Sequence, residues 1–97
     1  MIYGDFEWDH EKAQQNIAAH RVTFEEAATV FDDPLYIIYA DPDHSIEEQR
    51  YIIIGESERH RYLFVSYTER DLRTRIISAR ELTAKERKSY EGKKERL

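Results

Sequence analysis

Apolar residues in the first third of the chain recur at helical spacing, and capping residues mark where each helix begins. One stripe occupies positions i, i+3, i+4 and i+7 of a helix: Phe24, Ala27, Ala28 and Phe31. A capping box of Thr23 and Glu26 begins this helix, and Pro34 ends it because the residue before a proline disfavours helical backbone. An earlier helix over His10–His20 follows Asp9, a favourable N-cap residue.

Apolar, β-branched and aromatic residues then gather in four short runs separated by polar turn residues. We predict strands over four ranges: Leu35–Ala40, Arg50–Ile54, Tyr62–Thr68 and Leu72–Ala79. The short polar links between consecutive strands predict antiparallel pairing. A second capping box, Thr83 with Glu86, begins a last helix that extends to about Gly92.

These elements predict an α+β fold with two N-terminal helices, a four-stranded antiparallel sheet and a C-terminal helix. We expect the helices to cover one face of the sheet and to leave the other face partly open. The segment Asp5–Trp8 has room for a short extra strand. The length of 97 residues predicts one domain over residues 1–97, with residues 92–97 as a flexible tail.

The composition limits the cellular compartments in which the chain is expected to act. The chain has no cysteine, which excludes disulfides and thiolate metal sites and fits a reducing compartment. The first ten residues lack the features of a signal peptide, and no apolar run approaches the roughly 20 residues that span a bilayer. We therefore expect a soluble cytoplasmic protein with no membrane partner.

Charge is distributed unevenly along the chain. Residues 1–49 carry twelve acids against Lys12 and Arg21, whereas residues 50–88 carry ten basic residues against six acids. Eight of those ten are arginines, which bind phosphate through paired hydrogen bonds and stack on bases. The net charge of −5 argues against a simple nucleic-acid binder, yet the second half can hold a polyanion. A solvated face of mixed ion pairs explains the same composition.

Three polar residues of the first helix are spaced four residues apart and share one ridge: Lys12, Asn16 and His20. A lysine, an amide and an imidazole so placed can hold a phosphate and supply a general base near neutral pH. The alternative is structural. On that interpretation Lys12 is a surface charge, Asn16 hydrogen-bonds the helix end, and the helix dipole stabilises His20.

Arginines are concentrated around the last predicted strand and the helix after it. Arg73, Arg75 and Arg80 lie on or just beyond the strand, and Arg87 and Tyr90 lie in the early turns of the helix. Arginine and tyrosine near a helix N-terminus can bind a phosphate and orient a sugar or base. The alternative is ion pairing across strands with four acids: Glu47, Glu48, Glu69 and Asp71.

The residue set excludes several kinds of catalytic site. The histidines and aspartates lack a zinc-binding spacing, the three glycines form no phosphate-binding loop, and no serine lies in a nucleophile elbow. The enzyme class that remains compatible is phosphodiester chemistry without a metal or another cofactor.

Taken together and in order, a set of motifs resembles the BrnT toxin family over nearly the whole chain. In the first half the matching residues are Phe6-x-Trp8-Asp9-x-x-Lys12-x-x-x-Asn16-x-x-x-His20, Val22-x-Phe24-Glu25-x-Ala27 and Phe31-x-Asp33-Pro34. In the second half they are Glu48-x-Arg50, Gly55, Val65-x-Tyr67-Thr68-x-Arg70, Arg75-Ile76-Ile77-Ser78-Ala79-Arg80 and Glu86-Arg87-x-x-Tyr90. Each fragment is weak alone, but the ordered set is specific.

The resemblance implies a RelE-like fold and an endoribonuclease toxin that cleaves RNA and arrests translation. It also implies inhibition by a BrnA-type antitoxin with a ribbon-helix-helix part, in a 2:2 complex that represses its own operon. DNA would then be contacted through the antitoxin alone.

The corresponding hypothesis for mechanism is attack of the RNA 2′-hydroxyl on the adjacent phosphate without a metal. Four residues are the catalytic candidates: His20 as general base or acid, Arg50 and Arg80 as stabilisers of phosphorane charge, and Tyr90 for substrate orientation. Five others are expected to contact RNA: Lys12, Arg70, Arg73, Arg75 and Arg87.

One departure from the family pattern keeps two other interpretations open. The family usually has glycine after the histidine that corresponds to His20, whereas Arg21 stands there in this chain. A left-handed C-cap favours glycine, so Arg21 can reshape the helix end and displace His20. The chain can then be a degenerate toxin. It can also be a non-catalytic module that binds the antitoxin and acts as co-repressor.

Overall fold

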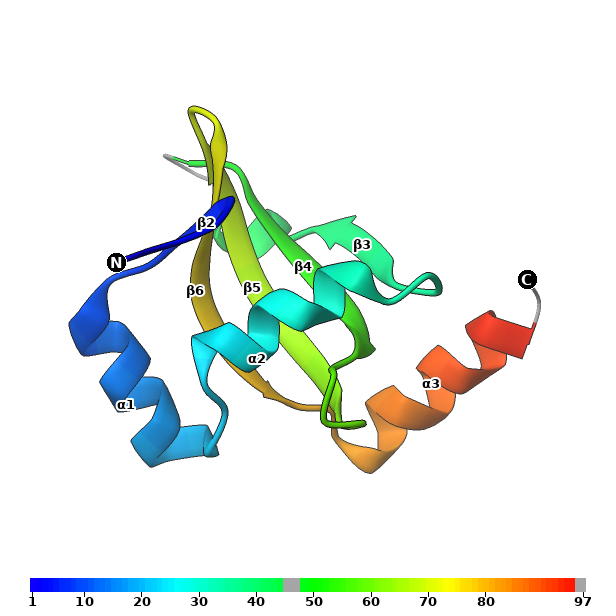
Figure 1. Ribbon diagram of the computed structural model, residues 1–97. Helices are drawn as coiled ribbons and strands as arrows, with labels where there is room; N and C mark the ends of the chain where they lie inside the picture. Colours follow the sequence, from blue (N-terminus) through cyan, green and yellow to red (C-terminus); the bar gives the residue numbers. More distant parts are fainter. Residues whose placement is uncertain (45–47, 96–97) are drawn as a thin grey trace.

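The computed structural model describes residues 1–44 and 48–95 (Figure 1). The strands are β1 Ile2–Tyr3, β2 Phe6–Glu7, β3 Ile37–Ala40, β4 Arg50–Glu56, β5 Tyr62–Arg70 and β6 Arg73–Glu81. The helices are α1 His10–His20, α2 Phe24–Thr29 and α3 Ala84–Glu95, with short 3-10 turns η1 Val30–Asp32 and η2 Pro42–His44. Within the described part of the chain, no helix is long and apolar enough to span a membrane.

The sheet differs from the predicted one. Its six strands lie in the order β1-β2-β6-β5-β4-β3, and β2 runs parallel to β6 while every other pair is antiparallel. The prediction of a four-stranded antiparallel sheet after two N-terminal helices is therefore wrong. The sheet is mixed, and two strands come before the first helix.

β2 lies within the segment Asp5–Trp8, where a short extra strand was expected, whereas β1 was not predicted. β1 and β2 have two residues each, so neither can display alternation, and Gly4 joins them with a φ of +60°. Backbone hydrogen bonds fix this N-terminal hairpin: the Met1 ammonium donates to Trp8 O at 2.7 Å, and Thr74 N donates to Asp5 O at 2.9 Å. The second bond joins segments about seventy residues apart, and no local pattern reveals such a pairing.

Helix ends follow their capping residues closely. α1 spans the predicted range, with the Asp9 carboxylate accepting from Lys12 N at 3.0 Å. Arg21 ends it in the left-handed conformation (φ 57°, ψ 34°) and donates its N–H to Ile17 O at 2.8 Å. Arg21 thus adopts the geometry that glycine would supply, and the end of the helix keeps its form. α3 continues to Glu95, beyond the predicted end at Gly92.

Because Arg21 is an L-residue in a left-handed conformation, Arg21→Gly should raise the free energy of unfolding. Relief of the Cβ clash is worth about 1–2 kcal/mol, and the extra freedom of glycine in the unfolded chain reduces the gain to about 1 kcal/mol. Chemical denaturation would measure it. Arg59→Gly, at an exposed residue without positive φ, is the control and should be neutral or destabilising. Equal losses in both variants would contradict the argument.

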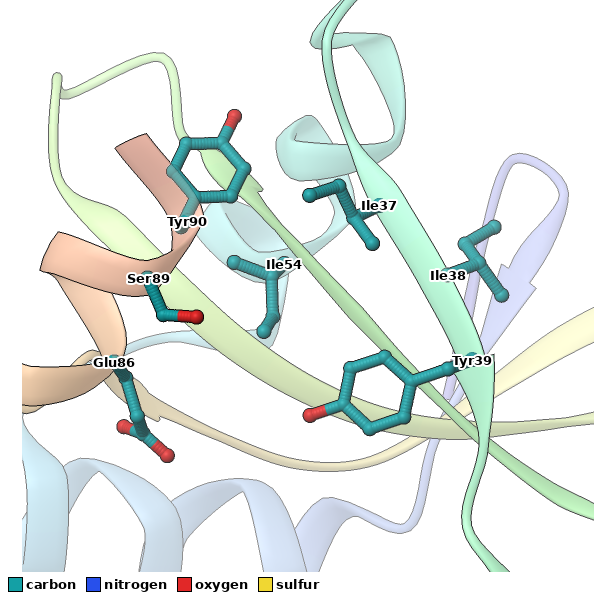
Figure 2. A pocket seen from close by; sticks show the side chains of 7 residues that line it. All are labelled: Ile37, Ile38, Tyr39, Ile54, Glu86, Ser89 and Tyr90. Carbon is teal, nitrogen blue, oxygen red and sulfur yellow. The ribbon is translucent and has the colours of Figure 1, made fainter. Parts of the chain in front are cut away.

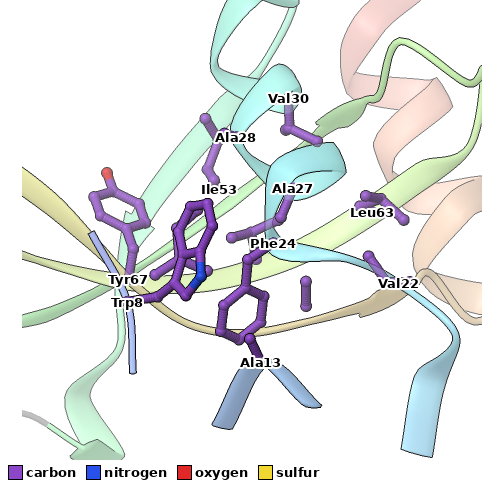
Figure 3. Close-up of a cluster of buried hydrophobic side chains, with 13 residues drawn as sticks. Trp8, Ala13, Val22, Phe24, Ala27, Ala28, Val30, Ile53, Leu63 and Tyr67 are labelled. Atoms are coloured by element: carbon purple, nitrogen blue, oxygen red, sulfur yellow. The ribbon is translucent and has the colours of Figure 1, made fainter. Parts of the chain in front are cut away.

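The main core lies between the sheet and helices α1 and α2 (Figure 3). Trp8 and Phe24 meet edge to face with ring centroids 5.8 Å apart, beneath which the sheet contributes Ile53, Leu63 and Val65. All of these side chains are buried, and their burial supplies the main driving force for folding.

The opposite face of the sheet carries a smaller apolar cluster under α3. Tyr90 packs there against Ile52 and Ile54, which alternate along β4 with the core residue Ile53. The helices therefore cover both faces, and the expectation that they share one face is wrong for α3. α3 covers one end of its face and leaves the remainder open.

Candidate functional site

Five arginines stand on the sheet face that α3 leaves partly open. We call this surface the arginine face and define it by Arg50 on β4, Arg70 on β5, and Arg73, Arg75 and Arg80 on β6. Strand register places Arg50 opposite Thr68 and Thr68 opposite Arg75, so that three strands contribute to one row. Arg70 lies opposite Arg73 at the end of the β5–β6 hairpin.

An irregularity in β6 brings Arg80 onto the same face as Arg75. These residues are five apart, and a regular strand would point them to opposite faces. Ser66 pairs with Ser78 while Tyr67 pairs with Ile76, so Ile77 is an extra residue that reverses the alternation. Arg80 consequently lies opposite Phe64, with its guanidinium 4.1 Å from the centre of that ring.

The row of Arg80 is separated from that of Arg75 by a strip of small hydroxyl side chains. Ser66 and Ser78 pair across β5 and β6 between the two rows, and both are partly exposed. From Thr68 to Phe64 the separation is about 13 Å, at roughly 3.3 Å per residue of strand. Extended side chains from the two rows can therefore converge on one phosphate or contact neighbouring phosphates of one nucleic-acid strand.

Carboxylates already neutralise several of these arginines. Arg75 pairs with Glu7 at 2.8 Å, and Arg70 pairs with Glu48 at 2.9 Å. Of the four acids considered for ion pairing, Glu48 does pair with an arginine, and Glu69 instead accepts from the Thr74 hydroxyl at 3.2 Å. Glu47 lies outside the described residues. An incoming phosphate must displace a carboxylate at each paired arginine.

Arg80 makes a bidentate pair with Glu86. Its two terminal nitrogens donate to the two oxygens of Glu86 at 2.8 and 3.0 Å, a bidentate geometry that a phosphate can also adopt. Glu86 is the acid of the capping box that begins α3 and also accepts from Thr83 N at 2.8 Å. The hydrogen bonds from Arg80 lower the pKa of Glu86 from 4.5 to about 2.

This pair predicts a pH-dependent contribution to stability. Because the pKa of Glu86 is lowered on folding, the contribution is fully present above pH 4.5 and is lost as the pH falls toward 2. Glu86→Gln should cost about 1 kcal/mol at pH 7, allowing for solvent screening, and the gap to wild type should close in acid. Denaturation between pH 7 and 2 measures it. Glu91→Gln, in the exposed pair with Arg87, is the control. A gap independent of pH would contradict the assignment.

Tyr90 is buried between α3 and the sheet, on the same sheet face as the arginines but under the helix. The residue is 2% exposed, and its hydroxyl lies 3.2 Å from both Asp33 Oδ2 and the Leu35 carbonyl, either of which it can donate to. Burial, with Asp33 as a further cause, raises the pKa of Tyr90. Figure 2 shows the ring reaching from α3 toward the sheet at the edge of a groove. In this arrangement Tyr90 anchors α3 and cannot touch RNA on the arginine face.

The ridge of α1 forms a separate groove along the edge of β6. Lys12 and His20 line a hollow of about 270 Å³ with Ile77 and Ser78. Asn16 lies beneath it and is buried: its amide donates to Ala79 O at 2.8 Å and to Val22 O at 3.0 Å, and its oxygen accepts from Ala79 N at 3.0 Å. Asn16 is thus a structural residue, as the alternative interpretation has it, while Lys12 and His20 remain exposed.

Ser78 is the point where the two regions meet. It lies on the arginine face and also lines the groove of Lys12 and His20.

Arg87 stands on α3, where it pairs with Glu91 at 3.1 Å, and its guanidinium lies 4.5 Å from the ring centre of Tyr62. The place of Ser66 and Ser78 between the arginine rows and the pairing of Glu86 with Arg80 were not predicted from the sequence. Strand parity could have revealed Ser66, but no sequence signal locates the extra residue in β6.

Comparison with known proteins identifies the family and a shared fold. A family model described as "Ribonuclease toxin, BrnT, of type II toxin-antitoxin system" matches residues 8–86. The crystal structure of the Brucella abortus ribonuclease toxin, BrnT, aligns with a TM-score of 0.60 and 22% identity, over 80% of this chain and 95% of that chain, which shows a shared fold. No curated protein matches the chain. Because the family model covers well over half of the sequence, the chain belongs to the BrnT family of ribonuclease toxins of type II toxin–antitoxin systems.

Proposed function

We propose that this toxin is a metal-independent endoribonuclease whose substrate lies across the arginine face. The observation that supports this most directly is the extra residue in β6, which gathers Arg50, Arg75 and Arg80 on one side of the sheet. Bidentate arginines stabilise the extra negative charge that develops on a phosphorus centre under attack. Within the described residues, no cluster of three or more potential metal ligands occurs.

In the proposed reaction the RNA supplies its own nucleophile. The 2′-hydroxyl oxygen bonds to the adjacent phosphorus as its proton passes to a general base. The bond from phosphorus to the 5′ oxygen breaks, and that oxygen takes a proton from a general acid. The products are a 2′,3′-cyclic phosphate and a 5′-hydroxyl. Positioning and charge stabilisation are the contributions required of the protein.

We assign residue roles in this proposal from the positions of the side chains. Arg80 and Arg50 stabilise the phosphorane; Arg70, Arg73 and Arg75 bind neighbouring phosphates. His20 acts as general base or acid, with Lys12 beside it, because their groove opens next to Ser78 on the same strand as Arg80. Arg87 contacts RNA from α3. A direct role for Tyr90 requires α3 to leave the sheet, since its hydroxyl is otherwise held by Asp33 and Leu35.

The test is cleavage of a labelled RNA by purified toxin with and without EDTA. We expect unchanged rates in EDTA and products that carry a 2′,3′-cyclic phosphate, identified by mass spectrometry. Loss of cleavage in EDTA that added Mg²⁺ restores would refute metal independence. Products with a 3′-hydroxyl would refute attack by the 2′-hydroxyl.

The proposed function also includes inhibition of the toxin by an antitoxin. As the toxin of a type II system, the chain has a protein antitoxin as partner and RNA as substrate. We propose that the antitoxin is of the BrnA type with a ribbon-helix-helix part, that the complex is 2:2, that it contacts DNA through the antitoxin, and that it acts in the cytoplasm. Light scattering of the purified complex measures its mass and tests the stoichiometry.

The carboxylates on the arginine face favour a second candidate function. With Arg70, Arg75 and Arg80 paired to acids, the chain can act as a non-catalytic partner of the antitoxin in a repressor complex. Expression in a bacterial host separates the two functions. A catalytic toxin stops growth and degrades RNA, whereas a pure binding module does neither. A degenerate toxin would regain toxicity on Arg21→Gly.

A further inference from the structure

The outer edge of β3 is open in the described part of the structure. β3 is the last strand of the sheet, paired with β4 on one side alone. Three large apolar side chains on or beside it are more than two fifths exposed: Tyr36, Ile38 and Tyr39. An exposed edge with unpaired backbone groups and apolar side chains is a template for another strand.

A groove adjoins this edge. Ile37 and Tyr39 extend from β3 toward α3, where Glu86, Ser89 and Tyr90 form the other wall, and the hollow measures about 410 Å³ (Figure 2). Side chains of a strand alternate between faces. A strand added to β3 would therefore place every second side chain in this groove, while its backbone pairs with the edge.

Charge limits what can occupy the edge. Residues 22–49, which include β3, contain no lysine or arginine, and of their eight acids Glu26 and Glu48 are already paired with Arg61 and Arg70. Asp32 and Asp33 stand before the strand, and Asp41 and Asp43 stand after it. RNA would be repelled there, and a second copy of the chain would bring two acidic edges together. An extended segment with apolar residues at alternate positions and lysine or arginine at its ends is complementary.

We propose that the antitoxin inhibits this toxin by adding such a basic-ended strand to the outer edge of β3, with its apolar side chains in the groove between β3 and α3. The proposal rests on the toxin–antitoxin function and does not depend on the mechanism of RNA cleavage. Main-chain hydrogen bonds to β3 supply affinity, and the groove supplies specificity.

The test uses the full toxin and its purified antitoxin. Tyr36→Lys and Tyr39→Lys put cations where the basic ends and the apolar side chains would lie. Leu72→Lys, at a residue 95% exposed in the β5–β6 turn, is the matched control. We expect antitoxin affinity to fall at least tenfold in the β3 variants and to stay unchanged in the control. Circular dichroism shows that each variant is folded.

Hydrogen exchange locates the contact independently of any substitution. We expect the amides of β3 to become protected when wild-type toxin binds antitoxin. Equal affinity of all three variants, or protection confined to other strands, would overturn the proposal. So would dimerisation of the toxin alone that Tyr39→Lys abolishes, which would assign the edge to a second copy. Failure of RNA cleavage leaves each of these readouts intact, so the two proposals fail separately.

Discussion

Arg80→Ala should lower the rate of RNA cleavage by about 10²–10³-fold, the usual cost of removing one preorganised donor to a charged transition state. Arg80 reaches the arginine face because of the extra residue in β6, and its guanidinium is held over the Phe64 ring and by both oxygens of Glu86. Substrate binding should change much less than the rate, because ground-state phosphate contacts are shared with Arg50 and Arg75. Single-turnover kinetics separate the two quantities.

Two further variants make this result specific. Arg80→Lys keeps the charge but loses the bidentate geometry, and it should recover a small part of the lost rate. Arg59→Ala removes an exposed arginine from the turn before β5 and should leave the rate unchanged. If Arg59→Ala and Arg80→Ala slow cleavage equally, the effect is one of overall charge, and the assignment of Arg80 fails.

Asn16→Ala should reduce the free energy of unfolding by about 3 kcal/mol, since three buried hydrogen bonds are lost and each unsatisfied backbone group costs about 1–3 kcal/mol. The Asn16 amide behaves like the backbone of an extra strand: it both donates to and accepts from Ala79 at the edge of β6. For a domain of this size the melting temperature should fall by roughly 15 °C. Scanning calorimetry measures it.

The side-chain nitrogen of Asn16 donates hydrogen bonds and its oxygen accepts one, so the two roles can be tested separately. Asn16→Asp preserves shape but places a carboxylate oxygen against the carbonyls of Ala79 and Val22, so it should destabilise the fold at neutral pH as much as alanine does. Gln15→Ala, at the exposed neighbour, should change stability by less than about 0.5 kcal/mol. Similar losses at positions 15 and 16 would show that helix propensity, and not the edge contact, sets the effect.

Local signals in the sequence located the elements whose causes are local. The stripe from Phe24 to Phe31 and the capping residues Asp9 and Thr23 predicted α1 and α2, because periodicity and capping act within a few residues. The pairing of β2 with β6 escaped prediction because two-residue strands have no periodicity and are stabilised by distant partners. The sheet was therefore predicted with too few strands and as wholly antiparallel.

The candidate site was predictable as a set of residue types but not as a geometry. The sequence singled out Arg50, Arg75 and Arg80 by type and position. Their common face depends on one extra residue in β6, which costs little energy and leaves no compositional trace. Tyr90 illustrates the converse, since its chemistry suggested substrate contact while its packing against β4 fixes it as an anchor.

The parallel pairing of β2 with β6 also limits when the sheet can form during synthesis on the ribosome. Phe6 leaves the ribosome early, but its partner Thr74 is made 68 residues later. Contacts so distant in sequence close late and slow the final step of folding. Synthesis proceeds at about 5–20 residues per second, so several seconds pass before β2 can dock. A nascent toxin thus lacks its assembled sheet until β6 has emerged, and this delay is a direct result of topology.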